Sequence, residues 1–141
     1  MTLSRRDFVA ALAAAGGATG IGAAARAMAE TTDAAADDPA VYVIATVTVK
    51  DGKRDEVVRI FNGIVPDVHA EDGCIYYEPA VDFDSGIPVQ EPLRPNVMVV
   101  VEKWESLAHL IAHLDEPHMH TYREAVADLV DGVTLQVLRR A

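Results

Sequence analysis

The sequence contains a single cysteine, Cys74, among 141 residues. One thiol cannot form an internal disulfide even in an oxidising compartment, so the fold must be stable without covalent cross-links. Positively charged residues are also scarce. The chain has 12 Lys and Arg residues and 22 Asp and Glu residues, which gives a formal net charge of −10. A surface of this sign repels phosphate groups, which disfavours a nucleic-acid partner. The chain also lacks a glycine-rich dinucleotide fingerprint and a flavin-type loop.

The first thirty residues have the composition of an export signal. Arg5-Arg6 is followed by Phe8, then by a mild apolar run, and Ala27-Met28-Ala29 forms a small-x-small cleavage site. These are the charged, apolar and cleavage regions of a secretory signal. The paired arginines resemble the twin-arginine motif, although the residues after Phe8 are not its commonest ones. We predict a twin-arginine signal peptide over residues 1–29 and a mature protein that is periplasmic or secreted, meeting the membrane only during export.

The alternative to a cleaved leader is a membrane anchor, since about twenty apolar residues can span a bilayer. Glycines at Gly16-Gly17, Gly20 and Gly22 interrupt this run, so cleavage is favoured. Residues 30–40 are mostly acidic or alanine and have no apolar periodicity, which predicts a disordered spacer. Loss of three arginines and one aspartate with the leader leaves a net charge of −12.

Residues 41–139 predict one α+β domain. β-Branched segments alternate with segments of helical apolar spacing in the order β-α-β-β-α-β, which is the ferredoxin-like pattern. Strands are expected at 41–49, 74–81, 96–104 and 133–138. Helices are expected at 53–70 with a kink at Pro66, at 107–114 with Ser106 as the N-cap, and from Pro117 to 129. Residues 82–95 are expected to form a loop.

Both faces of the predicted sheet are apolar. In the first strand, Val43 and Ala45 lie on one side while Tyr42 and Ile44 lie on the other. Two helices cover only one face of a four-stranded sheet, and a face that meets water normally alternates to polar residues. The second face is therefore predicted to be buried, either against another copy of the chain in a homodimer or around an apolar ligand.

Several short motifs resemble those of a known family. Residues 71–77, which read Glu-Asp-Gly-Cys-Ile-Tyr-Tyr, resemble the pattern Glu-x-Gly-Cys-x-x-Tyr, and residues 102–106 resemble Glu-x-Trp-x-Ser. His109, His113-Leu114 and Pro117-His118-Met119 follow, similar to the Ala-His-Leu and Pro-His-Phe elements. These patterns belong to the antibiotic biosynthesis monooxygenase family, and the resemblance covers residues 41–139.

The resemblance implies a dimeric α+β barrel that oxidises electron-rich phenols or hydroquinones with dioxygen, without flavin or metal. Such a reaction needs a base to deprotonate the phenol and a pocket that excludes water. The expected protein is an exported, cofactor-independent monooxygenase acting on a quinol or a related phenolic or polycyclic aromatic substrate. The loop at 82–95 is longer than the family's usual turn, and its apolar residues Phe83, Ile87 and Leu93 are candidates for a lid.

Four of the five histidines fall within twelve residues. Histidine accepts a proton near neutral pH, and His118 and His113 match the family pattern, so these two are the predicted catalytic bases. Trp104, Tyr77, Tyr122 and His109 are the predicted substrate-binding residues, as an aromatic wall or hydrogen-bonding partners for a flat substrate. The purely structural alternative is that the histidines cap turns and that Trp104 fills the core.

Three other functions compete with this hypothesis. In a metal site, His109 and His113 would share a helical face, with His118, His120, Asp115 or Glu116 completing the ligands for zinc or copper. Pro117 interrupts that helix, so we predict no metal. Haem degradation, found in a related branch of the fold, is disfavoured because Ala45 stands where that branch uses Asn. The same fold also suits a non-enzymatic dimeric protein that binds a small aromatic compound.

Overall fold

The computed structural model describes residues 39–141. The predicted signal peptide, and the predicted spacer up to residue 38, lie outside the described residues. Within 39–141, none of the helices has the length and apolarity needed to cross a membrane.

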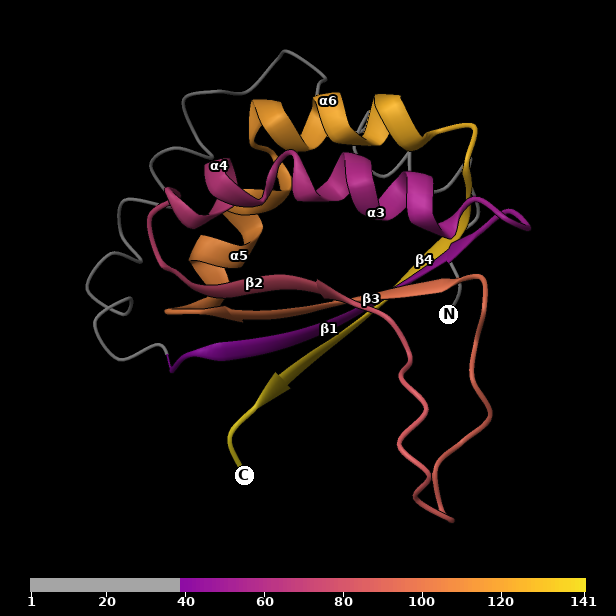
Figure 1. The fold of residues 1–141 in the computed structure, drawn as a ribbon. Coiled ribbons are helices and arrows are strands. Elements are labelled where there is room, and N and C mark those ends of the chain that lie inside the picture. Colours follow the sequence, from indigo (N-terminus) through magenta and orange to yellow (C-terminus); the bar gives the residue numbers. More distant parts are fainter. Residues whose placement is uncertain (1–38) are drawn as a thin grey trace.

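The described chain forms a four-stranded antiparallel sheet with its helices on one side (Figure 1). The strands are ordered β2-β3-β1-β4, and the chain order confirms the predicted ferredoxin-like fold. The elements are β1 (Val41–Val49), α3 (Arg54–Asn62), α4 (Val65–His69), β2 (Cys74–Ala80), β3 (Val97–Trp104), α5 (Leu107–Leu114), α6 (Pro117–Val126) and β4 (Val130–Arg139).

The first helical region differs from its prediction. A single helix over 53–70 with a kink at Pro66 was expected, but α3 ends at Asn62 and α4 begins at Val65. Proline lacks a backbone N–H and fits the first turn of a helix, where that donor has no intrahelical partner. Pro66 therefore lies in the first turn of α4, and the break precedes it. β4 is longer than predicted because it pairs along the whole length of β1.

The core lies between the sheet and the helices. Alternate residues of β1 and β3 point toward the helices and are buried, as period-two alternation requires. Phe61 of α3 stacks on Tyr77 of β2 and meets Tyr122 of α6 edge-on, with both ring centroids 5.3 Å away. Offset and edge-on ring pairs add to the stabilisation that burial gives. This aromatic cluster joins the sheet to both helical regions.

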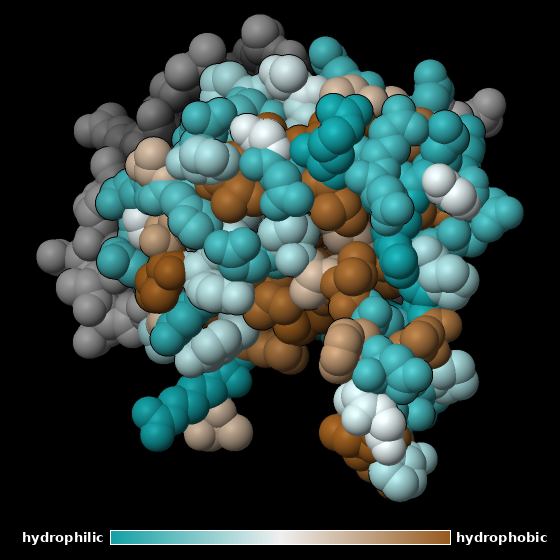
Figure 2. All heavy atoms as spheres, viewed as in Figure 1, coloured by the Kyte–Doolittle hydropathy of each residue, from teal (hydrophilic) through white to brown (hydrophobic). Residues whose placement is uncertain are grey.

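The opposite face of the sheet carries apolar side chains, as predicted. Ile44 of β1 pairs with Val101 of β3, and both are only half-buried. Tyr42 and Leu138, which also pair, are exposed at one end of this face. Figure 2 shows hydrophobic side chains at the lower edge of the body and along the segment that projects below it. Within residues 39–141, no helix lies over this face (Figure 1).

The segment joining β2 to β3 projects from the sheet on the side opposite to the helices (Figure 1). Two hydrogen bonds from the Arg94 guanidinium to the Asp82 carboxylate, of 2.7 and 2.9 Å, close its base and lower the pKa of Asp82 to about 2. Phe83 and Val89 are 80% and 88% exposed. The predicted lid does not cover the helix-side histidines of its own chain, because this segment extends the other way. We call residues 81–96 the projecting arm.

One carboxylate is buried in the core. Glu102 of β3 is 5% exposed, and Trp104 Nε1–H donates a hydrogen bond of 2.9 Å to its Oε2. Burial raises the pKa of Glu102 to about 7, and the nearby charge of Glu71 also raises it, while the Trp104 hydrogen bond opposes the shift. The side chain therefore loses its proton near neutral pH rather than near 4.5.

Glu102→Gln tests this arrangement. The folded protein holds the Glu102 proton up to about pH 7, whereas the unfolded chain releases it near pH 4.5. The bound proton on Glu102 therefore stabilises the folded protein fully below pH 4.5. This stabilisation falls as the pH rises from 4.5 to 7 and is lost above 7, a change of about 3 kcal/mol in the free energy of unfolding. Glutamine still accepts the Trp104 hydrogen bond but carries no charge. In urea denaturation across pH 4.5 to 8, the variant should lack this decline and be more stable than the parent above pH 7.

Glu105→Gln is the matched control, since Glu105 is an exposed glutamate directly after β3. The free energy of unfolding of this control should depend on pH as that of the parent does. If the free energy of unfolding of Glu102→Gln also declines with pH as steeply as that of the parent, the assignment of the buried proton to Glu102 is contradicted.

Candidate functional site

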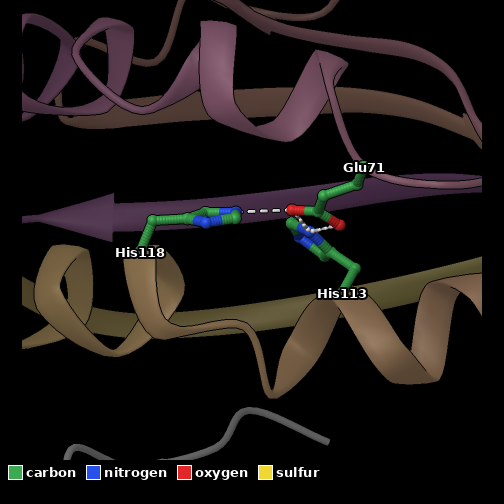
Figure 3. Close-up of side chains that lie close together, drawn as sticks. All are labelled: Glu71, His113 and His118. Atoms are coloured by element: carbon green, nitrogen blue, oxygen red, sulfur yellow. Dashed lines mark hydrogen bonds and ion pairs between the residues drawn. The ribbon is translucent and has the colours of Figure 1, made fainter.

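Three polar side chains from separate segments meet beside the core (Figure 3). Glu71 lies in the turn between α4 and β2, His113 in the last turn of α5, and His118 in the first turn of α6. Pro117 begins α6, and the preceding Glu116 is extended with φ −66° and ψ 142°. Because a residue before proline avoids the helical conformation, the chain turns here. The two histidines therefore approach Glu71 from different helices.

The Glu71 carboxylate bonds to both imidazoles. His113 Nδ1 lies 2.9 Å from Oε1 and 3.0 Å from Oε2, and His118 Nε2 lies 2.5 Å from Oε1. An ionised carboxylate only accepts hydrogen bonds, so His113 donates through Nδ1–H and His118 through Nε2–H. In the neutral rings, the free lone pairs are then on His113 Nε2 and His118 Nδ1.

The cluster passes from the core to the surface. The side chains of His113 and Glu71 are 2% and 9% exposed, and that of His118 is 20% exposed. Burial lowers the pKa of His113, although the Glu71 carboxylate opposes this shift. The His113 ring also packs against Trp104 and Tyr77, with centroid distances of 4.6 and 5.1 Å. His113 is thus a neutral donor held in the core, and His118 is the member that solvent reaches.

The predicted aromatic wall lies directly behind His113. Trp104, Tyr77 and Tyr122 are all buried, and Tyr77 packs edge-on against Trp104 with centroids 6.3 Å apart. The Tyr77 hydroxyl donates a weak hydrogen bond to Met119 Sδ at 3.9 Å. Burial raises the pKa of both tyrosines, so both hydroxyls stay protonated. The structure brings Trp104 and Tyr77 against His113 and places Tyr122 against Phe61, and the contact of all three with substrate remains a prediction.

His109 supports the turn that carries Glu71. Its ring bonds to Ser106, the N-cap of α5, with Nδ1 2.9 Å from Oγ. The ring also lies against Gly73, where an added Cβ would come within 2.2 Å of His109 Cγ. Gly73 has φ +77°, a conformation that favours glycine, and its carbonyl accepts a hydrogen bond from the Glu105 N–H. His109 therefore sits outside the Glu71 cluster and packs on the backbone next to it.

The metal site considered from the sequence, with His109 and His113 sharing a helical face, does not form among the described residues. His120 faces the surface and pairs with Asp115, with Nε2 3.0 Å from Oδ1, and His109 lies against Ser106 and Gly73. Among the described residues, the group whose ligand atoms lie within 4.8 Å of one another is Glu71, His113 and His118. The proximity of His109 and His120 in sequence does not bring them to this group, because their side chains leave the helices in other directions.

Sequence reasoning did not assign a role to Glu71, Gly73 or Glu102. Glu71 and Gly73 both stand in the motif at residues 71–77, and that motif was the available signal. Glu102 opens the motif at residues 102–106 in the same way. The motifs located these residues without revealing that Glu71 contacts both histidines.

Comparisons with known proteins identify a matching family and a curated relative. The family model described as "Antibiotic biosynthesis monooxygenase" matches residues 40–125. A curated relative from Escherichia coli strain K12, named "Probable quinol monooxygenase YgiN", is 41% identical over 99 residues, which is 69% of this chain and 94% of the relative.

Two solved structures share the fold. Rv0793 from Mycobacterium tuberculosis superposes with a TM-score of 0.60 at 25% identity, covering 72% of this chain and 95% of that one. SO0527 from Shewanella oneidensis superposes with a TM-score of 0.61 at 23% identity, covering 74% and 93%. The matched family model spans β1 to β3, Glu71 and both histidines, and this chain belongs to the antibiotic biosynthesis monooxygenase family.

Proposed function

We propose that this protein is a quinol monooxygenase that oxidises a quinol or a related phenolic substrate with dioxygen, without flavin or metal. The observation that carries the proposal is the Glu71 carboxylate bonded to two imidazoles, one of them reaching the surface. Membership of the family and the name of the E. coli relative support the substrate class.

The partly exposed His118 is the proposed catalytic base. Its Nε2–H is held by Glu71, which leaves Nδ1 to accept a proton from the substrate hydroxyl. The negative charge of Glu71 stabilises the imidazolium that forms and fixes the ring orientation, as the carboxylate does in a hydrolase triad. The resulting quinolate is electron-rich and transfers an electron to dioxygen. One oxygen atom then enters the ring and the other leaves as water, so that quinol and dioxygen yield a hydroxyquinone and water.

His113 has a positioning role in this mechanism. It binds both carboxylate oxygens of Glu71 from the core side, at 2.9 and 3.0 Å, while His118 binds from the surface side. The ring is 2% exposed and packed against Trp104 and Tyr77, so it holds the carboxylate against a rigid wall. Glu71 is thereby prevented from turning into solvent and away from His118.

Amide variants separate the base from the positioning residue. His118→Gln keeps an N–H donor near Nε2 but has no lone pair on its nitrogen, so oxygen uptake with menadiol should fall by about 100-fold or more. His113→Ala should also lower the rate because Glu71 loses its inner partner. His113→Asn keeps a hydrogen-bond donor near Nδ1 and should therefore retain most of the parental rate of oxygen uptake. Initial rates from an oxygen electrode, over the uncatalysed rate, measure each variant.

His120→Gln is the control, because His120 is on the same helix but pairs with Asp115 at the surface. Its rate should equal that of the parent. Oxygen uptake equal to the buffer rate for a panel of quinols would overturn the enzymatic proposal and leave the non-enzymatic binding protein.

We further propose that two copies of the chain associate through the uncovered sheet face. The apolar face and the projecting arm lie on the same side of the molecule (Figure 1), so a second copy placed there would cover both. Phe83 and Val89 of the arm are among the most exposed apolar residues described. A two-fold arrangement lets each arm lie on the partner, which is the self-complementary contact of a symmetric dimer.

A double variant of the arm tests the dimer. Phe83→Asp with Val89→Asp places charge on two side chains that make little contact within the chain, so the monomer should fold while association weakens. Size-exclusion chromatography with light scattering should give twice the monomer mass for the parent and a shift toward the monomer for the variant. Ile111→Asp, at an exposed apolar site on α5, should remain dimeric. A monomeric parent, or an unaffected arm variant, would contradict this interface.

We also propose export by the twin-arginine pathway, which carries proteins already folded. In full-length protein, Arg5→Lys with Arg6→Lys should retain the chain in the cytoplasm with its leader uncleaved. Arg26→Lys, close to the cleavage site, preserves the pair and should be exported normally. Cell fractionation and intact-mass measurement check both variants, and periplasmic, processed protein from the double variant would exclude this route.

A further inference from the structure

We propose that Glu71, His113 and His118 form a reversible zinc-binding site, and that zinc bound there switches off the base. The candidate ligand atoms are His113 Nδ1, His118 Nε2 and a Glu71 carboxylate oxygen, all within 4.8 Å of one another. Zinc binds two histidines and one glutamate in known catalytic sites and keeps its fourth position for water or another ligand. Zinc binding itself is independent of the proposed function, whereas the inhibition rests on it.

The spacing of the three side chains is close to what zinc requires. Bonds of about 2.0–2.1 Å in a tetrahedron place ligand atoms roughly 3.3 Å apart. The nitrogen-to-oxygen separations here are 2.5, 2.9 and 3.0 Å. The nitrogen-to-oxygen separations therefore need to lengthen by less than about 1 Å, and all three ligand atoms already lie within 4.8 Å of one another.

The three ligands also have a suitable environment. They come from a turn and two helix ends, and the 2% exposed His113 fixes one side of the site while the 20% exposed His118 leaves a path to solvent. The carboxylate supplies negative charge, and the imidazoles supply neutral nitrogens. Imidazole ligands suit zinc and copper, whereas magnesium and calcium prefer oxygen ligands, so this set selects against the commoner alkaline-earth ions.

Zinc and the proposed base compete through the tautomer of His118. Without metal, Nε2 carries the hydrogen that bonds to Glu71, and Nδ1 has the free lone pair. When zinc takes the Nε2 lone pair, the ring hydrogen must be on Nδ1. His118 then has no lone pair to accept a substrate proton. The ring keeps one hydrogen throughout, so coordination needs a change of tautomer and no net proton release from His118.

Calorimetric titration of untagged, EDTA-dialysed protein with zinc chloride tests the site. One zinc per chain is expected. His118→Gln and His113→Asn each keep a hydrogen-bond donor toward Glu71 but remove a ligand nitrogen, so each should weaken zinc binding by at least about 10-fold. Glu71→Gln removes the charged ligand and should do the same. Circular dichroism confirms that each variant is folded, and His120→Gln should bind zinc as the parent does.

Cobalt gives a spectroscopic readout that does not depend on activity. Co²⁺ in place of zinc should produce visible absorption bands of a low-coordinate site in the parent, and the bands should be lost in His118→Gln. The zinc site is overturned if folded parent protein binds no zinc at 100-fold excess, or if the ligand variants bind it with parental affinity.

Oxygen uptake with menadiol separates this inference from the proposed function. Stoichiometric zinc should lower the rate of oxygen uptake by the protein, and EDTA should restore that rate. The background rate is measured with zinc and menadiol in the absence of protein. Zinc that binds and raises the rate would overturn both the inhibition and the metal-free mechanism while leaving the site in place. Tight zinc binding by a protein with no oxygen uptake on any quinol would overturn the enzymatic proposal and the inhibition, again leaving the metal site.

Discussion

The carboxylate of Glu71 joins three segments of the chain that are otherwise separate. It accepts hydrogen bonds from His113 and His118, which lie 42 and 47 residues further along the sequence on different helices. A carboxylate at the edge of a core is costly unless its lone pairs are occupied, and these two donors occupy them. The same contacts therefore satisfy a buried charge and orient two imidazoles. The chemistry proposed for the site follows from that requirement.

The surroundings of Glu71 limit how far it can move. Gly73 allows the turn to pass directly against His109, and the Gly73 carbonyl is held by the Glu105 N–H after β3. On the inner side, His113 packs against the buried rings of Trp104 and Tyr77. Preorganisation of this kind is valuable for proton transfer, because a donor and acceptor already in place need little rearrangement during reaction. The core behind this site also buries Glu102, whose pKa is raised to about 7 by that burial.

The two sides of the sheet carry different groups of side chains. The helix side holds the core and the Glu71 cluster, while the other side presents Ile44, Val101 and the projecting arm. An apolar face of this kind is normally covered, and the proposed second copy of the chain would cover it symmetrically. The proposed association and the proposed proton chemistry would therefore use opposite faces of the sheet.

The sequence by itself determined the strand and helix order, the apolar character of both sheet faces and the motifs that indicate the family. These features follow from local periodicity and from short patterns, which a chain carries whether or not it is folded. Only the tertiary structure decided that His113 and His118 share Glu71 while His109 and His120 do not. All four histidines lie within twelve residues, and periodicity treats them alike. Their partners depend on the break before Pro117 and on a turn more than forty residues earlier, and contacts at that separation arise only when the sheet and helices pack.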